Sequence, residues 1–570
     1  MRYIAFATDY DGTIASGGRV DEATLGALEK LKASGRKLFL VTGRHLGDLQ
    51  NVFPDAVLFD RIVAENGAVI YDPAKREEKT LAEAPKAEFV AALHAERIPF
   101  DVGRSIISSH TPYEKPILDV IRRLALEYQV IFNKGAVMVL PSGVNKATGL
   151  RAALEELRLS FHNAVGIGDG ENDHAFLTAS ECGVAVANAV PALRERADIV
   201  TAADHSEGAA ELISHLLRDD LQDHDEQLAR SSLVLGERSD EAGAKISIVP
   251  NRSGILVAGA SSSGKSSAVA GLLEQFEERG YHFCLIDPEG DYENFAGALS
   301  VGSPTEPPDP NVVMRALESE RSVIVNLMGV AVRERPGAFA ALLPKILEMR
   351  ARTARPHWLI IDEAHHLAPT SWTPASTTMP QEMGGTILVT VDPERLSGAA
   401  LALVDVVFAT GEAAREVLAA FAKAAHAAFP YAVPPAPQGG QALVWFPRRQ
   451  GPPVIVTAPV AKSERRRHRR NYAEGELSLE QSFYFRGPES KLNLRAQNLM
   501  TFLQLAEGVD EETWLFHLKQ GDYSRWFETV VKDQELADCA RSIERDNHQT
   551  AAETHARIKE EIEKRYTAPA

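Results

Sequence analysis

The sequence is poor in cysteine and lacks any long apolar run. Among 570 residues only Cys182, Cys284 and Cys539 are cysteines, and their wide separation excludes the paired spacing of zinc fingers and of disulfide frameworks. No uninterrupted apolar run approaches the roughly 18 residues needed to span a bilayer, and no basic-then-apolar leader precedes the strand-like residues after Met1. We therefore expect a cytoplasmic protein without a membrane-spanning segment.

The chain also lacks net positive charge. Its 79 acidic residues outnumber its 61 basic ones and give a formal charge of -18, which argues against a general nucleic-acid coat but leaves room for a locally basic groove. The length suggests three or four domains of about 150 residues each. Hydrophobic residues at 45% and charged residues at 25% are ordinary for folded proteins, so we do not expect wholesale disorder.

Four short motifs mark the first 217 residues. In three of them an apolar run is followed by polar residues: "YIAFATDYDG", "KLFLVTGR" and "AVGIGDGENDHAFL". The fourth, "GVNKATGL", begins a predicted helix. Strands that alternate with helices predict a parallel sheet, and the carboxyl ends of its strands share one edge. The polar residues there are Asp9, Asp11, Thr42, Lys146, Asp169, Asn172 and Asp173. They can face one ligand, although an Asp-Gly turn without chemistry is the alternative for the first two alone.

In this order the motifs resemble those of the haloacid dehalogenase superfamily of phosphatases, in the subgroup with a cap inserted before the lysine motif. The stretch "AENGAVIYD" is also similar to that subgroup. The resemblance covers about residues 1–217. It implies an α/β fold with a Rossmann-like parallel sheet and a small α/β cap at about residues 74–141.

The resemblance also implies a reaction. Asp9 would attack phosphorus to form an aspartyl-phosphate, and Asp11 would protonate the leaving group and then activate water. Thr42 and Lys146 would hold the transferring phosphoryl oxygens. The Mg²⁺ ligands would come from Asp9, Asp11, Asp169 and Asp173. The implied substrate is a small phosphorylated metabolite such as a sugar phosphate; the cap residues Arg104, His110 and Lys115 are either substrate contacts or solvated surface residues.

The middle of the chain carries a second phosphate-binding pattern. "SGILVAGASSSGKSSAVAGLLEQF" predicts a strand, a glycine-rich loop and a helix, which is the context of a P-loop. About a hundred residues later, "PHWLIIDEAHHL" supplies an apolar strand that ends in Asp362 and Glu363. We expect Asp362 to hold Mg²⁺ and Glu363 to activate water for ATP hydrolysis. A helix cap is the alternative for Asp362, and a metal site is the alternative for His365 and His366.

With the stretch "CLIDPEGDYENF", residues 226–460 resemble the HerA/FtsK-type ATPases. This resemblance implies a RecA-like P-loop domain. It also implies a homo-oligomer, which in that family is usually a hexameric ring that acts on DNA. The nucleotide-contacting residues would be Gly259, Ser263, Gly264, Lys265, Ser266, Ser267, Asp287 and Glu289, with Mg²⁺ on Ser266 and Asp362. A neighbouring subunit's arginine would come from Arg350, Arg352 or Arg355. The chain departs from the family at Val391, where a glutamine is usual, and Thr390 is the alternative sensor of hydrolysis.

The remaining residues predict a basic linker and a small all-α domain. Residues 461–477 read as a solvated hinge or as a contact for a polyanion. In residues 478–570, apolar residues at helical spacing predict a core that includes Trp514, Phe516, Trp526 and Phe527 rather than a base-stacking platform. We expect the last helix, "AAETHARIKEEIEKRY", to project into solvent.

Three hypotheses for function follow. The first is a bifunctional protein, with a phosphatase for a small metabolite fused to an ATPase. The second is a nucleic-acid processing enzyme, in which an ATP-driven ring grips the strand and the phosphatase acts on phosphorylated ends. The third is an oligomeric switch or scaffold that ATP organises with little turnover.

Overall fold

The computed structural model describes the chain except for residues 242, 251–252, 262, 293–294, 369–383, 431, 450, 460, 462–476, 478, 480, 532, 547–549 and 567–570. The chain divides into two compact units, the first of Met1–Ser232 with Ala351–Ala354 and the second of Leu233–Arg350 with Arg355–Ala570. Most of the basic run predicted at 461–477 lies outside the described residues. Within them, no helix combines the length and the hydropathy that crossing a membrane requires.

The first unit is built on an eight-stranded sheet with strand order β12-β11-β10-β1-β2-β3-β4-β5. The strands are β1 (Ala5–Thr8), β2 (Lys37–Val41), β3 (Arg61–Ala64), β4 (Val69–Asp72), β5 (Glu77–Thr80), β10 (Ala164–Gly168), β11 (Cys182–Ala185) and β12 (Ile199–Val200). Pairing is parallel from β12 to β3 and antiparallel at β4 and β5. The predicted parallel sheet is confirmed, with two antiparallel strands added at one edge.

Helices cover this sheet, and side-chain caps set where they begin. They are α1 (Glu22–Ala33), α2 (Leu46–Val52), α5 (Lys146–Glu156), α6 (His174–Ala179), α7 (Pro191–Arg194) and α8 (His205–Asp219). Every residue of β1 is buried, as expected for a strand covered on both faces. The side chain of Asn145 caps α5 by accepting a hydrogen bond from the backbone N–H of Thr148. In return, the side chain of Thr148 accepts one from the backbone N–H of Asn145. This capping box places Lys146 at the first position of the helix.

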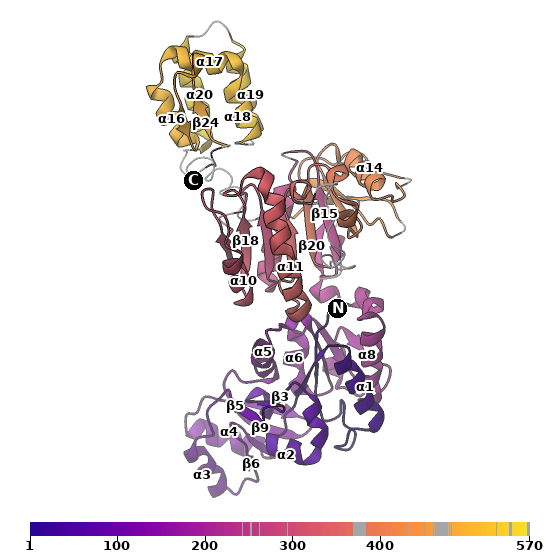
Figure 1. Ribbon diagram of the computed structural model, residues 1–570. Helices are drawn as coiled ribbons and strands as arrows, with labels where there is room; N and C mark the ends of the chain where they lie inside the picture. The colour runs from indigo at the N-terminus through magenta and orange to yellow at the C-terminus, as the bar shows by residue number, and fades with distance from the viewer. Residues whose placement is uncertain are drawn as a thin grey trace. The chain divides into compact units, whose positions relative to one another are not determined.

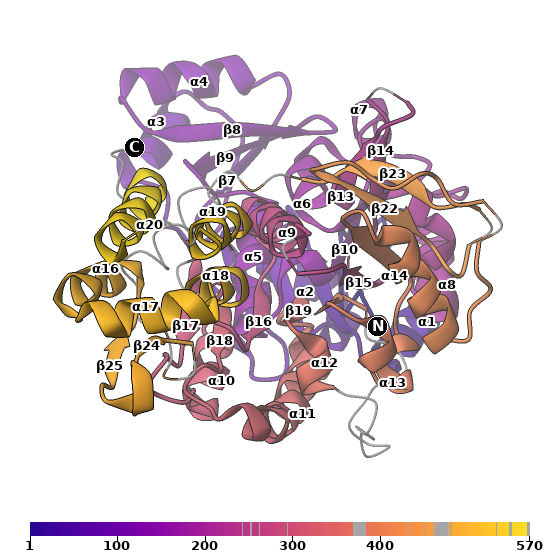
Figure 2. The same ribbon diagram turned by 90° about the horizontal axis from the view of Figure 1, so that it is seen from above.

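The cap is a separate four-stranded antiparallel sheet with two helices on one face. Its elements are α3 (Ala87–Ala95), β6 (Asp101–Val102), β7 (Ile107–His110), α4 (Glu114–Arg123), β8 (Tyr128–Asn133) and β9 (Ala136–Pro141), with strand order β6-β7-β9-β8. Figure 2 shows α3 and α4 lying along the same side of β8 and β9. Their apolar faces and the sheet form one core, which includes Phe89, Leu93, Ile117 and Val137. The predicted order of helix, two strands, helix, two strands is confirmed.

The second unit contains an eleven-stranded sheet with order β14-β13-β23-β22-β21-β15-β20-β19-β16-β18-β17. The strands are β13 (Leu233–Arg238), β14 (Lys245–Ile248), β15 (Gly254–Ala258), β16 (Phe283–Asp287), β17 (Ala298–Val301), β18 (Ser322–Asn326), β19 (Trp358–Ile361), β20 (Thr386–Thr390), β21 (Val406–Thr410), β22 (Gln441–Trp445) and β23 (Val454–Thr457). Pairing is parallel from β21 to β17 and antiparallel through β22, β23, β13 and β14.

Both faces of this sheet are covered, since alternate residues of β15 enter different cores. Leu256 and Ala258 belong to one cluster, and Ile255 and Val257 belong to the other. The helices are α9 (Lys265–Arg279), α10 (Pro310–Glu318), α11 (Arg335–Thr353), α12 (Ala364–Leu367), α13 (Gly398–Leu401) and α14 (Ala414–Ala424). Helix α11 runs along one face of the sheet in Figure 1. The second unit is therefore an α/β domain followed by a helical module.

The C-terminal module contains strands as well as helices, so the prediction of an all-α domain is wrong. Its elements are β24 (Phe483–Phe485), β25 (Leu494–Ala496), α16 (Leu499–Gly508), α17 (Glu511–Gln520), α18 (Asp522–Thr529), α19 (Gln534–Glu544) and α20 (Ala551–Tyr566). Strands β24 and β25 pair antiparallel. Asn498 caps α16 by accepting the backbone N–H of Thr501, so the residues before it are free to form β25.

The last helix also differs from expectation. Ile558 and Ile562 of α20 are buried in the core of the module, and Thr554 accepts a hydrogen bond from the indole of Trp514 at 3.0 Å. A narrow apolar stripe is thus enough to dock a helix whose other faces are charged. The predicted core positions Trp514, Trp526 and Phe527 are buried, and Phe516 is half-buried.

Candidate active site

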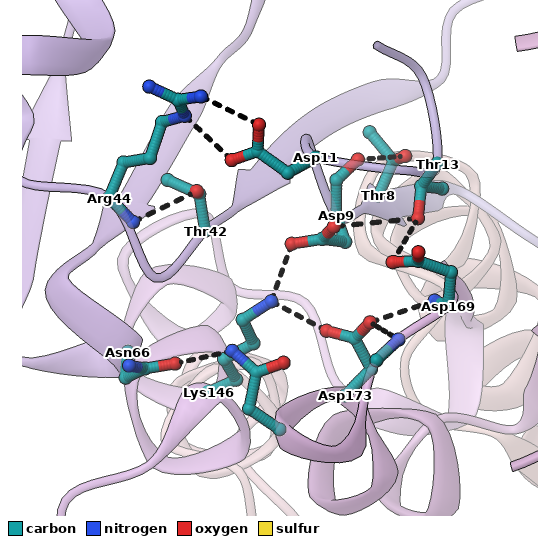
Figure 3. Close-up of polar contacts among 12 residues, drawn as sticks. Thr8, Asp9, Asp11, Thr13, Thr42, Arg44, Asn66, Lys146, Asp169 and Asp173 are labelled. Atoms are coloured by element: carbon teal, nitrogen blue, oxygen red, sulfur yellow. Dashed lines mark hydrogen bonds and ion pairs between the residues drawn. The ribbon is translucent and has the colours of Figure 1, made fainter. Parts of the chain in front are cut away.

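Three neighbouring strands of the first unit carry the polar residues to one edge. Strand β1 pairs in parallel with β10 on one side and with β2 on the other. Asp9, Asp169 and Thr42 directly follow these three strands, and all three are buried. Figure 3 shows them around a common centre with Lys146 and Asp173. The structure therefore brings these five of the predicted motif residues together.

Lys146 joins two of the carboxylates. Its ammonium nitrogen lies 2.5 Å from Asp9 Oδ1 and 2.5 Å from Asp173 Oδ1 (Figure 3). Burial disfavours the ammonium form, but the charges of Asp173 and Asp9 outweigh it and raise the pKa of Lys146. Burial and the charge of Asp173 raise the pKa of Asp9. The positive charge of Lys146 thus lies beside the carboxyl group of Asp9, and burial makes the ionised form of that group less favourable.

Asp9, Asp169 and Asp173 form a carboxylate cluster, with one oxygen of each within 4.8 Å of the others. Asp173 is already engaged, because its Oδ1 binds Lys146 and its Oδ2 accepts the backbone N–H groups of Asp169 and Gly170 at 2.8 Å each. Hard carboxylate oxygens at this spacing suit Mg²⁺. The donor set therefore fits the ion, and Asp173 also positions both Lys146 and the loop.

Two glycines leave space for this cluster. A Cβ at Gly12 would lie 2.1 Å from Asp169 Oδ2, and the residue has a φ of +83°. A Cβ at Gly168 would lie 2.6 Å from Asp173 Oδ2. A side chain at either position would displace a carboxylate, so both glycines are required by close approach and Gly12 also by its backbone conformation.

Asp11 lies at the rim of the site rather than in the cluster. Its two carboxylate oxygens accept hydrogen bonds from Arg44 Nε at 2.6 Å and Nη2 at 2.7 Å. Arg44 also donates its backbone N–H to Thr42 Oγ1 and its Nη1 to Asp48. The bidentate pair fixes Asp11 in one orientation, and the side chain of Asp11 is 44% exposed. That exposure leaves Asp11 within reach of a bound molecule.

The cap residue that reaches the cluster is Lys134, in the turn between β8 and β9. Its ammonium group pairs with Asp169 Oδ2. The predicted cap residues behave differently: Arg104 pairs with Glu78, His110 contacts the backbone oxygen of Thr111, and Lys115 is exposed. None of the three has a recorded contact with the carboxylate cluster within the described part of the cap.

The second unit carries the predicted glycine-rich loop between β15 and α9. Lys265 at the start of α9 donates to the backbone oxygens of Gly259 at 3.0 Å and Ala260 at 2.9 Å. Gly264 has a φ of +94°, and Ser263 Oγ lies 2.6 Å from Thr410 Oγ1. Ser266 and Ser267 are half-buried in the first turn of α9. Lys265, at the N-terminus of a fifteen-residue helix, therefore binds backbone oxygens at the start of the loop.

Acidic residues follow two other strands of this sheet. Asp287, at the end of β16, accepts the backbone N–H groups of Gly290 and Tyr292, and burial raises its pKa to about 7. Asp362 follows β19, and burial with the charges of Asp291 and Glu363 raises its pKa. Glu289, in the turn after β16, is half-buried. Strand β20 separates β19 from β15 in the sheet, so these parallel ends share an edge with the loop.

His365 links the predicted hydrolytic residue to the predicted sensor. Its Nδ1 lies 3.3 Å from Glu363 Oε2 and 3.2 Å from Thr390 Oγ1. Burial and the neighbouring His366 lower the pKa of His365 to about 4, so the ring is neutral at pH 7. Thr390 is the last residue of β20, and the apolar Val391 follows it.

Two of the three candidate arginines are held within the chain. Arg350 donates to the backbone oxygens of His357 and Gly384, and burial lowers its pKa to about 10. Arg355 is buried and pairs with Glu320. Arg352 is exposed. Of the three, Arg352 is therefore the one whose side chain is exposed.

Comparison with known proteins places the first unit in a family. A model of the haloacid dehalogenase-like hydrolases matches residues 6–105 and 117–213. A phosphoglycolate phosphatase of Methanothermobacter thermautotrophicus is 32% identical over 221 residues, which cover 37% of this chain and 98% of that protein. One of Methanosarcina acetivorans is 29% identical over 222 residues, covering 38% and 97%. The chain therefore belongs, through its N-terminal unit, to the haloacid dehalogenase-like hydrolase family.

A solved haloacid dehalogenase-like hydrolase from Bacteroides thetaiotaomicron aligns with 38% of this chain and 99% of its own, at 20% identity and a TM-score of 0.34. The family model ends at residue 213. The interpretation of residues 226–460 as an ATPase consequently stays a prediction.

Sequence reasoning missed three residues of the first site. Arg44 stood in the stretch "KLFLVTGR" without a role, although it directly follows the Thr42-Gly43 pair. Thr13 donates to Asp169 Oδ1 at 3.2 Å and follows the "DYDG" motif. Lys134 had no local signal beyond its place in an "NKG" turn, because its contact with Asp169 spans 35 positions in the sequence.

Proposed function

We propose that the N-terminal unit is a magnesium-dependent phosphatase that hydrolyses a small phosphorylated metabolite through a covalent intermediate on Asp9. The observation that carries this proposal is the ammonium group of Lys146 held between Asp9 and Asp173, next to Asp169. The relatives named phosphoglycolate phosphatase favour a small phosphomonoester as substrate.

Each residue has a task in this reaction. The carboxylate of Asp9 forms a bond to phosphorus as the bond to the leaving oxygen breaks, and Lys146 and Thr42 stabilise the phosphoryl oxygens. Asp11 gives a proton to the leaving oxygen and then takes one from the water that hydrolyses the aspartyl-phosphate. Mg²⁺ on Asp9 and Asp169 would offset the negative charge that separates a carboxylate from a phosphate dianion.

Phosphate release by the full chain tests the proposal. The substrates are a panel of sugar phosphates, phosphorylated hydroxy acids, nucleotides and 5′- or 3′-phosphorylated oligonucleotides. We expect release from a small metabolite that stops with a chelator, returns with Mg²⁺ and is lost in Asp9→Asn. Asp55→Asn, an exposed aspartate of the same unit, is the matched control. Release that is equal in Asp9→Asn and the control would refute the proposal, and cleavage confined to oligonucleotides would favour nucleic-acid processing.

We propose ATP binding as the function of the second unit. It is supported by the N-terminus of α9 after Gly264, where backbone N–H groups and the helix dipole favour phosphate, and by Lys265 at that end, which contacts the backbone oxygens of Gly259 and Ala260. We expect Lys265→Ala to weaken binding of a fluorescent ATP analogue by at least about tenfold, since it removes a charge-assisted phosphate contact. Lys423→Ala, an exposed lysine on α14, is the control. Equal affinity of the two variants would remove the support for this site.

A further inference from the structure

The cap hairpin, which consists of β6, β7 and the turn between them, is bound by a single carboxylate of the turn after β3. Glu65 accepts the backbone N–H of Arg104 on Oε1 and that of Ser105 on Oε2, each at 3.0 Å. Its side chain is 2% exposed. A Cβ at Gly103 would lie 2.6 Å from Glu65 Oε2, so the backbone of the hairpin lies directly against the carboxylate. Glu65 therefore anchors the cap to the parallel sheet.

The carboxylate of Glu65 keeps its charge although it is buried. Burial alone would raise the pKa of Glu65, but His45 and the backbone N–H groups of Arg104 and Ser105 outweigh it and lower that pKa. Glu65 and Asn66 have φ values of +51° and +53°, a left-handed conformation that glutamate rarely adopts. The hydrogen bonds to the cap hairpin therefore stabilise a backbone conformation that a glutamate does not favour by itself.

This conformation directs two backbone N–H groups at the loop that follows β2. Glu65 donates its N–H to the backbone oxygen of Arg44 at 3.0 Å, and Asn66 donates its N–H to that of Thr42 at 3.1 Å. Arg44 in turn donates from Nε and Nη2 to the carboxylate of Asp11 (Figure 3). The cap hairpin, Glu65, Arg44 and Asp11 are thus joined in one continuous series of contacts.

His45 adds a second link between the cap and this loop. Its Nε2 lies 3.1 Å from Ser108 Oγ in β7, and its Nδ1 lies 3.6 Å from Glu65 Oε1. A Cβ at Gly103 would lie 2.4 Å from His45 Nδ1, so the hairpin is in close contact here too. The backbone of Arg44 is therefore tied to the cap twice, through Glu65 and through the adjacent His45.

Asp11 depends on Arg44 for its orientation. Its side chain is 44% exposed, and both of its oxygens accept hydrogen bonds from Arg44, at 2.6 and 2.7 Å. A general acid must lie within hydrogen-bond reach of the leaving oxygen, and an exposed side chain keeps one rotamer only when a partner holds it. A displaced Arg44 should therefore impair proton transfer by Asp11.

The residues proposed to bind the phosphoryl group have supports of their own. Lys146 is held between Asp9 and Asp173. Thr42 donates its backbone N–H to the backbone oxygen of Val63 at 2.8 Å, in the ladder between β2 and β3. Weakening the contact between Glu65 and the cap hairpin should consequently leave phosphoryl binding in place while proton transfer suffers.

We propose that Glu65 is a positioning residue that links docking of the cap to proton transfer: it binds the cap hairpin, holds Arg44, and through Arg44 orients Asp11 towards the leaving group. The leaving oxygen is then protonated in the site that the docked cap closes, where water is excluded. This inference rests on the proposed phosphatase function, and it assigns to Glu65 no contact with the substrate.

The test uses two esters that differ by one methylene group. 4-Nitrophenyl phosphate releases a phenolate that needs no proton, whereas 4-nitrobenzyl phosphate releases an alcohol that must be protonated. We would measure single-turnover release by rapid quench, with the full chain and Mg²⁺. In Glu65→Gln, release of the benzyl alcohol should slow by about tenfold or more, a part of the roughly 10²–10⁴-fold that a general acid supplies, and release of the phenolate should change by less than about twofold. An equal fall with both esters, or no fall, would overturn the inference.

Glu78→Gln is the matched control. It removes the carboxylate that pairs with the Arg104 side chain on the outside of the same hairpin, and it leaves Glu65 in place. Neither rate should change in this variant. A loss confined to the benzyl ester in Glu78→Gln would show that any weakened cap contact has this effect, and would overturn the specific role of Glu65.

A double-mutant cycle tests whether Glu65 acts through Arg44. Arg44→Ala should lower the ratio of the benzyl rate to the phenyl rate by itself. Adding Glu65→Gln should lower that ratio no further, because the two changes interrupt the same series of contacts. Losses that multiply in the double variant would contradict the route through Arg44.

Hydrogen exchange supplies a readout that needs no activity. The amides of Arg104 and Ser105 should exchange faster in Glu65→Gln than in wild type or Glu78→Gln, since a glutamine offers one acceptor oxygen where the carboxylate offers two. Unchanged exchange would overturn the anchoring of the cap hairpin. If wild-type protein released phosphate from neither ester nor from any member of the panel, the phosphatase function itself would fail. An active wild type with an unchanged ratio in Glu65→Gln would refute the role of Glu65 alone.

Discussion

Lys146 Nζ lies 2.5 Å from Asp9 Oδ1 although the two residues are 137 positions apart in the chain. The contact joins the end of β1 to the start of α5, and both side chains are buried. It fixes the carboxylate of Asp9 at the centre of the site and supplies the positive charge that a phosphoryl group would need there.

Replacing Lys146 with methionine should damage both stability and activity. Asp9 and Asp173 would lose their shared cation, and breaking a buried ion pair costs about 3–5 kcal/mol. Loss of a preorganised charge at the phosphoryl oxygens should lower kcat by about a hundredfold or more. Native-state hydrogen exchange of amides in β1 and β10 measures the first effect, and phosphate release measures the second. Lys37→Met, at a lysine that is half exposed in the same unit, should change neither; similar losses in both variants would contradict this role.

Asp11→Asn should separate the two chemical steps. The asparagine cannot donate or accept the proton, so kcat for an alkyl phosphate should fall by about 10²–10⁴-fold. An ester with an activated leaving group, such as 4-nitrophenyl phosphate, needs no proton in the first step, so its initial burst should survive while turnover slows. Rapid-quench kinetics with both esters checks this. An equal loss of the burst with both esters would argue against Asp11 as the acid.

The carboxyl group of Asp9 should make stability depend on pH in the absence of metal. Burial and the charge of Asp173 raise its pKa in the folded protein, while the unfolded chain titrates near about 3.9. The folded state therefore keeps this proton to higher pH, and its contribution to the free energy of unfolding falls as pH rises from about 4 through the folded pKa. Asp9→Asn removes that dependence.

Hydrogen exchange on the metal-free protein measures the effect. The stability of Asp9→Asn relative to wild type should increase between about pH 4 and pH 8. Asp55→Asn provides the comparison for an exposed aspartate. If the free energies of unfolding of Asp9→Asn and wild type differed by the same amount over this whole pH range, Asp9 would titrate alike in the folded and unfolded states.

The proposed ATP site yields a separate prediction at Glu363. Glu363→Gln should keep ATP binding but lower turnover by about a hundredfold or more, because an amide cannot act as a general base. Thr390→Val should lower turnover less, since the recorded link from Thr390 to Glu363 runs through His365. A coupled assay for ADP, with binding measured in parallel, tests both. Turnover that is unaffected by Glu363→Gln would contradict the assignment, and the absence of turnover in wild type would favour the scaffold hypothesis.

Docking of the last helix can be tested at Ile562. This side chain is fully buried in the C-terminal module, and an Ile→Ala change at such a site costs about 2–5 kcal/mol. Hydrogen exchange of α17 and α20 should accelerate accordingly in Ile562→Ala, whereas Arg557→Ala on the exposed side of α20 should have little effect. Unchanged protection in Ile562→Ala would support a helix that projects into solvent.

The sequence predicted the first site well where its geometry is local. Asp9, Thr42 and Asp169 each follow an apolar strand, and parallel strands carry their ends to one edge. Lys146 stands at the start of the helix that "GVNKATGL" predicts. The cap's order of elements was also readable, because each helix and strand has its own periodicity.

Contacts made across the fold were beyond the sequence. The pair of Arg44 and Asp11 spans 33 positions, and no spacing rule connects a lysine in a cap turn to Asp169. In the C-terminal module the few apolar positions of α20 concealed a docked helix, since two buried isoleucines among charged residues give only a weak pattern. The short strands β24 and β25 were missed because three residues are too few for a period of two to be recognised.

The covalent intermediate on Asp9 is the most direct test of the central claim. The full-length Asp11→Asn variant, mixed with Mg²⁺ and 4-nitrophenyl phosphate and then quenched in acid, should accumulate a phosphorylated peptide. Mass spectrometry should place the phosphoryl group on Asp9, and hydroxylamine should remove it. Phosphate release that proceeds in wild type with no label on Asp9, or a label that persists in Asp9→Asn, would contradict the account.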